Sequence, residues 1–236
     1  MNKDFKYPVI INKYIALKQL GSRKEADRLL KAKKIWINDK LAEPGQMVEE
    51  GDVVVVEKIE DYQYVIFHKP EGVITHSPQV GEEEVADYVK TKTRLAPIGR
   101  LDKDSSGLIL LTNDGRVTER LLHPDFWHEK EYEVGVNKPI SPSEVKQLQN
   151  GIELDDGYMT RKCRVRQIDE RSLIITLTEG KKRQIRRMLE SLGYRVRMLH
   201  RTRIMNLRLG DLPEGQWREL GKQEISELLK SLSLTA

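Results

Sequence analysis

The seventeen residues from Gly99 to Gly115, GRLDKDSSGLILLTNDG, constrain the fold of this chain more than any other segment. A carboxylate, Asp102, stands between the cations Arg100 and Lys103, and the apolar run Leu108–Leu111 follows at once. A short apolar run bounded by turn residues predicts a buried strand. Loops braced by rigid strands are where reactive groups tend to lie, but an Asp in a loop also serves to cap or turn the chain. The spacing alone leaves both interpretations of Asp102 open.

The size and composition of the chain limit its class. With 236 residues, 33% of them charged and 38% hydrophobic, the chain is long enough for two domains with full cores. The N-terminal residues lack the apolar core of a signal peptide, and no stretch approaches the roughly 20 apolar residues that a membrane span needs. The single cysteine, Cys163, excludes an internal disulfide, and the five histidines are too scattered for metal-ligand spacing. We therefore expect a cytoplasmic protein without a membrane partner or a metal site.

Positive charge is concentrated in one segment of the chain. The net charge is only +4, yet residues 161–203 hold fourteen Lys and Arg against four Asp and Glu, an excess of ten. Such a local excess indicates a polyanionic partner, and RNA is the natural candidate. The alternative is a solvated face whose charges are paired within the protein.

Residues 1–59 are predicted to form a small separate domain. A second helix there begins with a capping box, in which the Ser22 hydroxyl accepts a backbone N–H and Glu25 reaches back. Short strands are expected at 35–37 and 53–56. The phrase GSRKEADRLLKAKKIWINDK resembles the α-L RNA-binding domain first known in a small-subunit ribosomal protein. A first amphipathic helix is expected on Ile11, Tyr14, Ile15 and Leu20. Four cations of the second helix are expected to face outward, Arg23, Lys24, Arg28 and Lys31, and the first three are candidate RNA contacts.

Residues 60–236 mix strands and helices without the regular alternation of βαβ units. We predict an α+β fold, in which a mixed, mostly antiparallel sheet is flanked by helices and preceded by the small RNA-binding domain. Strands are expected at 65–67, 108–111, 132–136 and 173–177, and helices after Gly115 and Ser141, at 183–192 and around 225–232.

Four separated motifs occur in order in this second domain. They are HKPEG at 68–72, GRLD at 99–102, KEY at 130–132 and EGKKRQIRRM at 179–188. Together they resemble the motifs of bacterial ribosomal RNA pseudouridine synthases of the RsuA branch. Asp104 and Asp114 are as acidic as Asp102, and only the register of the motif selects Asp102. The resemblance implies three catalytic residues, Asp102, Tyr132 and Arg186, with Arg186 as the basic partner of Asp102. It also implies RNA contacts by Arg100, Lys69, Arg183 and Arg187.

The reaction that the resemblance implies explains these residue types. Pseudouridine formation breaks the N1–C1′ bond of a uridine, turns the base and joins C5 to C1′, so no cofactor is expected. The step at the ribose calls for a carboxylate as nucleophile or base. A guanidinium keeps that carboxylate ionised in a site closed to water, because it stays charged itself. A tyrosine offers a flat face to the base flipped out of its stack, and Arg100 is a candidate to fill the vacated space or hold the neighbouring phosphate.

The choice of RNA depends on finer resemblance. The segments 128–132 and 200–206 are most like the RluF-type members of the branch, which implies 23S ribosomal RNA as substrate. The same chemistry on 16S ribosomal RNA or on tRNA stays open, because phosphate contacts carry no sequence information. A noncatalytic RNA-binding ribosome-assembly factor is the alternative from another class, and a glycosidase lacks a convincing second carboxylate. The family implies a monomer. Trp127 and His128, beside the KEY motif, are open to two interpretations, RNA contact or buried packing.

Overall fold

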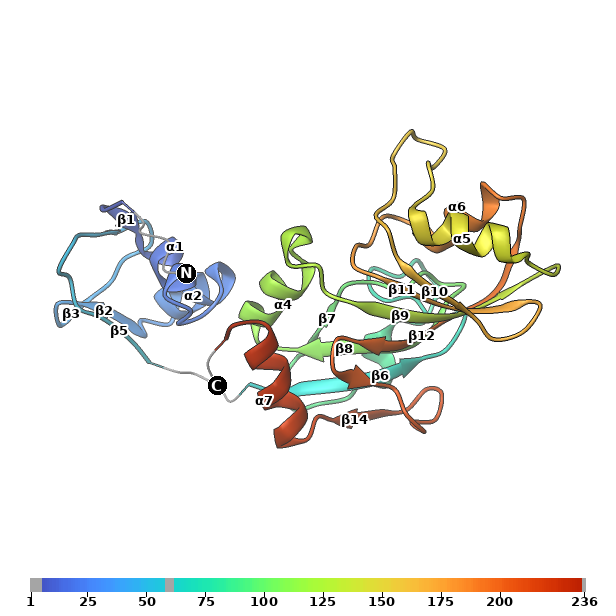
Figure 1. The fold of residues 1–236 in the computed structure, drawn as a ribbon. Coiled ribbons are helices and arrows are strands. Elements are labelled where there is room, and N and C mark those ends of the chain that lie inside the picture. Colours follow the sequence, from blue (N-terminus) through green and yellow to red (C-terminus); the bar gives the residue numbers. More distant parts are fainter. Residues whose placement is uncertain (1–5, 58–61, 235–236) are drawn as a thin grey trace.

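The computed structural model describes residues 6–57 and 62–234, which form a small N-terminal domain and a larger domain built on one sheet (Figure 1). The predicted boundary between residues 59 and 60 lies outside the described residues. In the small domain two helices, α1 (Ile11–Leu17) and α2 (Arg23–Lys31), share a core with a three-stranded sheet of order β3-β2-β5. The strands of this domain are β1 (Val9–Ile10), β2 (Ile35–Ile37), β3 (Lys40–Leu41), β4 (Met47–Val48) and β5 (Val54–Val56).

Helix α2 forms as its sequence predicts. Ser22 and Glu25 make the capping box, which satisfies backbone N–H groups that the first turn would otherwise leave unpaired. The apolar side of the helix is buried, whereas Arg23, Lys24 and Arg28 are exposed. The first helix is shorter than predicted. It ends at Leu17, so that Leu20 lies beyond it and is 44% exposed.

The larger domain is built on a nine-stranded sheet of order β10-β11-β9-β12-β8-β6-β14, with β13 paired to β12 and β7 paired to β8. Only the β12–β8 pair is parallel among the named strand pairs of the described residues, so the prediction of a mixed, mostly antiparallel sheet is confirmed. The strands are β6 (Tyr64–Lys69), β7 (Ala96–Ile98), β8 (Ser106–Thr112), β9 (Lys130–Val136), β10 (Arg164–Gln167), β11 (Ser172–Leu177), β12 (Val196–Ile204), β13 (Leu207–Arg208) and β14 (Trp217–Glu219).

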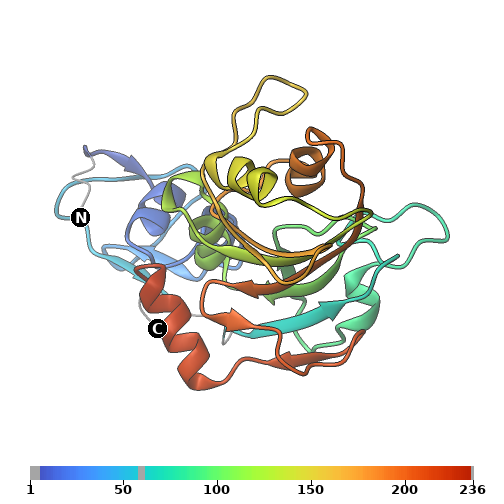
Figure 2. The same ribbon diagram turned by 45° about the vertical axis from the view of Figure 1, so that its right-hand side comes forward.

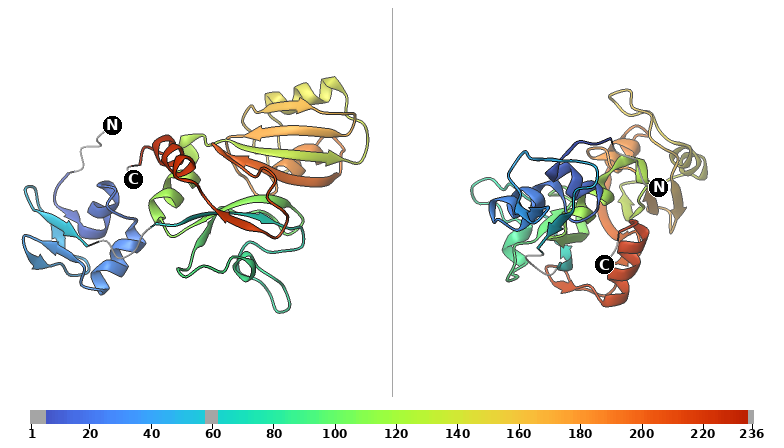
Figure 3. Two further views of the ribbon diagram at one scale, coloured as in Figure 1. Left: turned by 90° about the horizontal axis from the view of Figure 1, so that it is seen from below. Right: turned by 90° about the vertical axis from the view of Figure 1, so that its left-hand side faces the viewer.

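Helices cover the two halves of the sheet separately (Figures 2 and 3). Helices α5 (Pro142–Asn150) and α6 (Gln184–Glu190) share one core with β9, β10 and β11. Helices α4 (Gly115–Leu122) and α7 (Lys222–Ser231) share another with β6 and β8, whose opposite face packs on the short helix α3 (Val85–Tyr88). The sheet therefore consists of two separately packed halves that meet where β12 lies beside β8.

The junction between the halves depends on Gly107. This glycine of β8 has φ +110°, in the region that side chains rarely adopt. It pairs with Arg201 of β12, and a Cβ added at residue 107 would overlap the backbone nitrogen, carbon and oxygen of Arg201. The close approach fixes β12 against the end of the loop that carries Asp102.

The strand β8 is followed by a buried ion pair that the sequence did not reveal. Asp114 is fully buried, caps α4 through the backbone N–H of Arg116 and pairs with the Arg116 guanidinium at 2.9 Å. The same guanidinium donates to the Gln19 carbonyl of the small domain, and the Tyr62 hydroxyl donates to Glu25 of α2. The N-terminus of α4 thus contacts the small domain. None of the helices in residues 6–57 and 62–234 has the length and apolar composition of a membrane span.

Candidate active site

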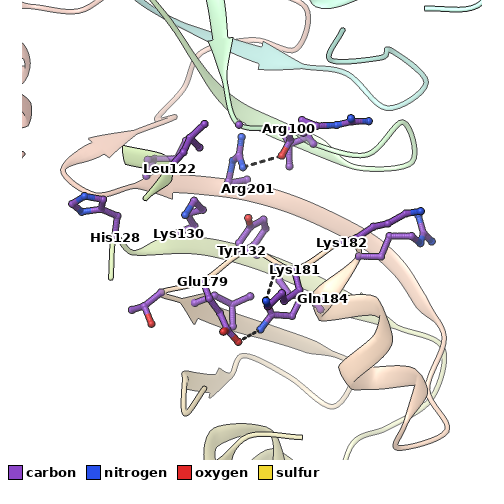
Figure 4. A pocket seen from close by; sticks show the side chains of 18 of the residues that line it. Arg100, Leu122, His128, Lys130, Tyr132, Glu179, Lys181, Lys182, Gln184 and Arg201 are labelled. Atoms are coloured by element: carbon purple, nitrogen blue, oxygen red, sulfur yellow. Dashed lines mark hydrogen bonds between the residues drawn. The ribbon is translucent and has the colours of Figure 1, made fainter. Parts of the chain in front are cut away.

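A pocket of about 830 Å³ opens where the loop before β8, the strand β9 and the segment before α6 meet (Figure 4). The structure brings four of the sequence-predicted site residues to its wall: Asp102, Tyr132, Arg183 and Arg100. In Figure 4 the side chains of Lys130 and Tyr132 lie between Arg201 on one side and Glu179 on the other.

The loop that carries Asp102 is held by hydrogen bonds on several sides. The Thr75 hydroxyl donates to the Leu101 carbonyl at 2.7 Å and accepts from the Leu101 N–H at 3.1 Å. The Gly72 N–H donates to the Lys103 carbonyl at 2.7 Å, so the HKPEG turn supports the loop directly. The Asp102 side chain itself stays 36% exposed at the pocket. A carboxylate is thereby presented on a fixed backbone.

Arg183 is the guanidinium beside Asp102. Its Nη1 lies 3.8 Å from the Asp102 carboxylate, and it also pairs with Asp104 at 3.2 Å. Arg183 is the N-cap of α6 with a left-handed backbone, φ 52° and ψ 32°, so the predicted helix from 183 begins one residue later. Arg183 lies where residues 179–182, which line the pocket, lead into α6, and its guanidinium lies next to the loop that carries Asp102.

The expected pair between Asp102 and Arg186 is not among the ion pairs of the described residues. Arg186 instead lies in the first turn of α6, 8% exposed, where its Nη2 donates to the Asp104 carbonyl at 2.5 Å and to the Ser105 hydroxyl at 3.3 Å. Burial alone would raise the pKa of Asp104, but the Arg183 hydrogen bond and the Arg186 charge outweigh it and hold this pKa below its usual value. Arg186 therefore fixes the loop that carries Asp102, while Arg183 faces the Asp102 carboxylate.

The strands β9 and β12 carry two basic residues at the pocket that were not selected as site residues from the sequence. Lys130 lies two residues before Tyr132 on β9 and therefore on the same face of the strand, and Arg201 of β12 is the register partner of Tyr132. Arg201 is 2% exposed and donates to the Leu108 carbonyl at 2.7 Å and the Arg100 carbonyl at 3.4 Å. Burial, with Arg201 nearby, lowers the pKa of Lys130 to about 8. The period of two could have identified Lys130, whereas the position of Arg201 depends on strand register.

The floor of the pocket is a hydrogen-bonded acid. Glu179, from the EGKKRQIRRM motif, is 9% exposed. It accepts from the Tyr158 hydroxyl at 2.7 Å and from the Gln184 amide at 2.5 Å. It also accepts from the Arg161 backbone N–H at 3.0 Å. These donors occupy its oxygens, so Glu179 connects the elements of the pocket and is not a second free carboxylate beside Asp102.

The other predicted RNA contacts do not line this pocket. Lys69 is fully buried, and its Nζ donates to the carbonyls of Pro70 and Val73, so the expectation that it faces RNA is wrong for this structure. The reason is its place on the interior strand β6. Arg187 pairs with Asp155 and Asp156 outside the pocket wall. Arg23, Lys24 and Arg28 remain exposed on α2. Among the described residues, no group of three His, Cys, Asp or Glu is arranged to hold a metal ion.

Comparison with known protein families identifies both domains. Residues 63–191 match the family model described as RNA pseudouridylate synthase, and residues 11–54 match the S4 domain.

Individual relatives span nearly the whole chain. The chain is 40% identical to the dual-specificity RNA pseudouridine synthase RluF of Escherichia coli strain K12, over 94% of this chain and 79% of that protein. It is 37% identical to ribosomal large subunit pseudouridine synthase B of Bacillus subtilis, over 92% of this chain and 94% of that protein. A crystal structure of a pseudouridylate synthase matches with a TM-score of 0.71 at 28% identity, covering 93% of this chain and 99% of that one.

Proposed function

The chain belongs to the RNA pseudouridylate synthase family, and on that premise we propose that it isomerises one specific uridine of 23S ribosomal RNA, with Asp102 as the catalytic carboxylate. The observation that supports this role for Asp102 most directly is its geometry. Its side chain lies at the pocket, is partly open to a ligand and is 3.8 Å from the Arg183 guanidinium. Asp114 is fully buried in an ion pair, and the Asp104 carboxylate is shared by Arg183 and Arg186.

The pocket residues suit the chemistry of the isomerisation. When the N1–C1′ bond breaks, the bonding electron pair goes to the base. C5 then bonds to C1′, the proton of C5 is released and N1 takes up a proton, so that the product is an isomer of the substrate. Asp102 acts at the ribose, and the Arg183 guanidinium, 3.8 Å from its carboxylate, balances the negative charge of Asp102 when RNA excludes water. Tyr132 offers its ring to the uracil, which must leave its stack at a cost of a few kcal/mol. Arg100, exposed at the edge of the pocket, is placed to contact the phosphate backbone or the vacated position.

One observation favours the large-subunit RNA as substrate, and a second favours an RNA substrate in general. The Bacillus subtilis relative carries that specificity in its name, and the small domain matches a family model whose exposed helix here bears Arg23, Lys24 and Arg28. These cations suit phosphate contacts, which set affinity without reading sequence. The name of the Escherichia coli relative states dual specificity, and a second RNA substrate, with tRNA as the candidate, is therefore part of the proposal.

A direct test compares Asp102→Asn with Asp211→Asn, a matched change at an exposed aspartate outside the pocket. Tritium release from 23S ribosomal RNA labelled at C5 of uridine should be abolished in the first variant and unchanged in the second. RNA affinity should persist in both, because it depends on the cations. Turnover by Asp102→Asn at the wild-type rate would contradict the assignment.

The substrate is tested by mapping pseudouridine in RNA from a strain that lacks the gene. We expect one 23S position to lose its modification and to regain it when the wild-type gene, but not Asp102→Asn, is restored. Loss confined to 16S ribosomal RNA or to tRNA would overturn the 23S assignment while leaving the chemistry in place.

A further inference from the structure

Large apolar side chains are exposed at the mouth of the pocket, on the segment between α4 and β9. Trp127 is 56% exposed and Phe126 is 44% exposed, so buried packing is the wrong interpretation of Trp127. Leu122, at the end of α4, is 47% exposed and lines the pocket. We call the four rings of this segment the aromatic rim: His123, Phe126, Trp127 and His128.

The rings of the aromatic rim are ordered by contacts with each other and with cations. The Phe126 and His128 rings are stacked, with centroids 5.8 Å apart and planes 17° apart. The Arg161 guanidinium lies 4.2 Å from the centre of the Trp127 ring, and the Arg120 guanidinium lies 5.3 Å from that of Phe126. Trp127 keeps more than half of its surface exposed although Arg161 lies against its ring. Part of the indole surface therefore remains accessible for stacking with a ligand.

The backbone holds Trp127 in this exposed position. Its φ of 54° and ψ of 39° are left-handed, an uncommon conformation for a bulky residue that tends to occur at functional sites. The next residue, His128, donates from its ring Nε2 to the Arg120 carbonyl at 3.1 Å. The exposed indole is therefore presented by a braced turn.

The aromatic rim continues the wall of the pocket. His123, His128 and Arg161 line the pocket, and the Arg161 backbone N–H donates to Glu179 on its floor. A nucleotide that flanks one held in the pocket is joined to it by a single phosphate, so this edge of the pocket lies within its reach.

We propose that the aromatic rim binds an unpaired base of the substrate RNA, the neighbour of the uridine held in the pocket, and that Trp127 is the ring on which this base stacks. The proposal rests on the proposed function of the pocket. An RNA base fits because its flat ring matches the exposed indole, and Arg120 and Arg161 supply positive charge to the adjoining phosphates. Stacking on an aromatic ring accepts any base, so the site favours an unpaired neighbour over a particular sequence.

The stacking itself is tested by fluorescence, without any reaction. The probes are single-stranded RNA dodecamers of adenosine and of uridine, with heparin as a polyanion that has no bases. The Trp127 signal is the difference between wild-type protein and Trp127→Phe. We expect the dodecamers to quench this signal and heparin at equal charge to leave it unchanged. Equal quenching by heparin, or no quenching by either RNA, would overturn the proposal.

Kinetics on a full-length 23S ribosomal RNA transcript give the second test. Trp127→Ala should lower kcat/KM about 5- to 150-fold, the factor that corresponds to ~1–3 kcal/mol per stacked base. The loss should appear mainly in KM, and Trp127→Phe should recover most of it. The matched control is Ile168→Ala, which truncates a side chain that is 48% exposed and outside the pocket wall.

The outcomes of the two tests separate this proposal from the function it rests on. If Trp127→Ala behaves like Ile168→Ala, or if Trp127→Phe is as impaired as Trp127→Ala, the stacking role is refuted although the enzyme is active. If wild-type protein shows no turnover of the transcript, the 23S assignment fails, and the quenching experiment alone decides whether Trp127 stacks on bases.

Discussion

Arg183 and Arg186 lie three residues apart, but replacing each by Met should have different effects. Arg186→Met should mainly lower the stability of the fold, and Arg183→Met should mainly lower turnover. Arg186 is 8% exposed and donates to the Asp104 carbonyl and the Ser105 hydroxyl. A hydrogen bond from a charged group contributes ~1.5–3 kcal/mol, and its loss leaves a loop carbonyl unsatisfied. The Arg186 Nε is buried without a hydrogen-bond partner, and this unfavourable burial offsets part of the stabilisation from the two hydrogen bonds. We expect Arg186→Met to lower the free energy of unfolding by ~2–3 kcal/mol.

Arg183→Met should leave stability nearly unchanged. Its side chain is 41% exposed, and its carboxylate partners Asp102 and Asp104 are 36% and 43% exposed. Ion pairs this open to solvent contribute less than ~1 kcal/mol. The same change removes the cation nearest Asp102, so turnover should fall sharply, and Arg183→Lys should restore only part of it because a single charge replaces a planar, two-point donor.

Urea unfolding and tritium release measure the two effects on the same preparations. Arg186→Met should unfold at a lower urea concentration than the wild type, with an unchanged slope. Arg183→Met should unfold like the wild type and lose turnover. Wild-type stability in Arg186→Met, or wild-type turnover in Arg183→Met, would refute this division of roles.

Two further predictions concern the junction of the sheet and the buried lysine of the pocket. Gly107→Ala forces a side chain at φ +110° into the Arg201 backbone and should cost ~2–5 kcal/mol in the free energy of unfolding, so a wild-type unfolding midpoint would contradict the close approach of β8 and β12. Burial lowers the pKa of Lys130 from 10.5 in the unfolded chain to about 8 in the folded protein. Between pH 8 and pH 10.5 the folded protein therefore binds fewer protons than the unfolded chain, and stability rises with pH. The destabilisation caused by burying the charged lysine is complete below pH 8 and disappears as the pH approaches 10.5. Lys130→Met should therefore exceed wild-type stability by ~1–3 kcal/mol at pH 7, with the difference shrinking by pH 10.5 in denaturant titrations, and a difference independent of pH would contradict this.

Elements whose signals are local were predictable from the sequence. The capping box of α2, the proline and capping box at the start of α5 and the apolar run of β8 all depend on residues close together in the chain, and each forms as expected. The left-handed backbone at Arg183 carries no such signal, since Arg is not a residue that favours that conformation. The helix start there was consequently placed one residue early.

The sequence motifs predicted which residues belong to the site, but not which of their side chains contact one another. The motifs selected Asp102, Tyr132 and Arg183, which all line the pocket. Their alignment predicted Arg186 as the basic partner of Asp102, whereas the structure has Arg183 in that position. That choice requires knowing which side chain of α6 points across to the loop, and this depends on how α6 packs on its half of the sheet. Arg201 illustrates the same limit, because its contact with the loop follows from the β12–β8 pairing at Gly107.

Charge counted along one segment overstates the free basic surface for the same reason. The segment 161–203 has few acids of its own, which favours a polyanion site over internal pairing. In the folded protein, acids from other segments supply partners: Arg164 and Arg203 pair with Glu129, and Arg187 pairs with Asp155 and Asp156. Lys181 and Lys182 remain exposed at the pocket. Phosphate contacts from this segment should therefore concentrate beside the pocket, and the salt dependence of RNA binding should be less steep than an excess of ten charges implies.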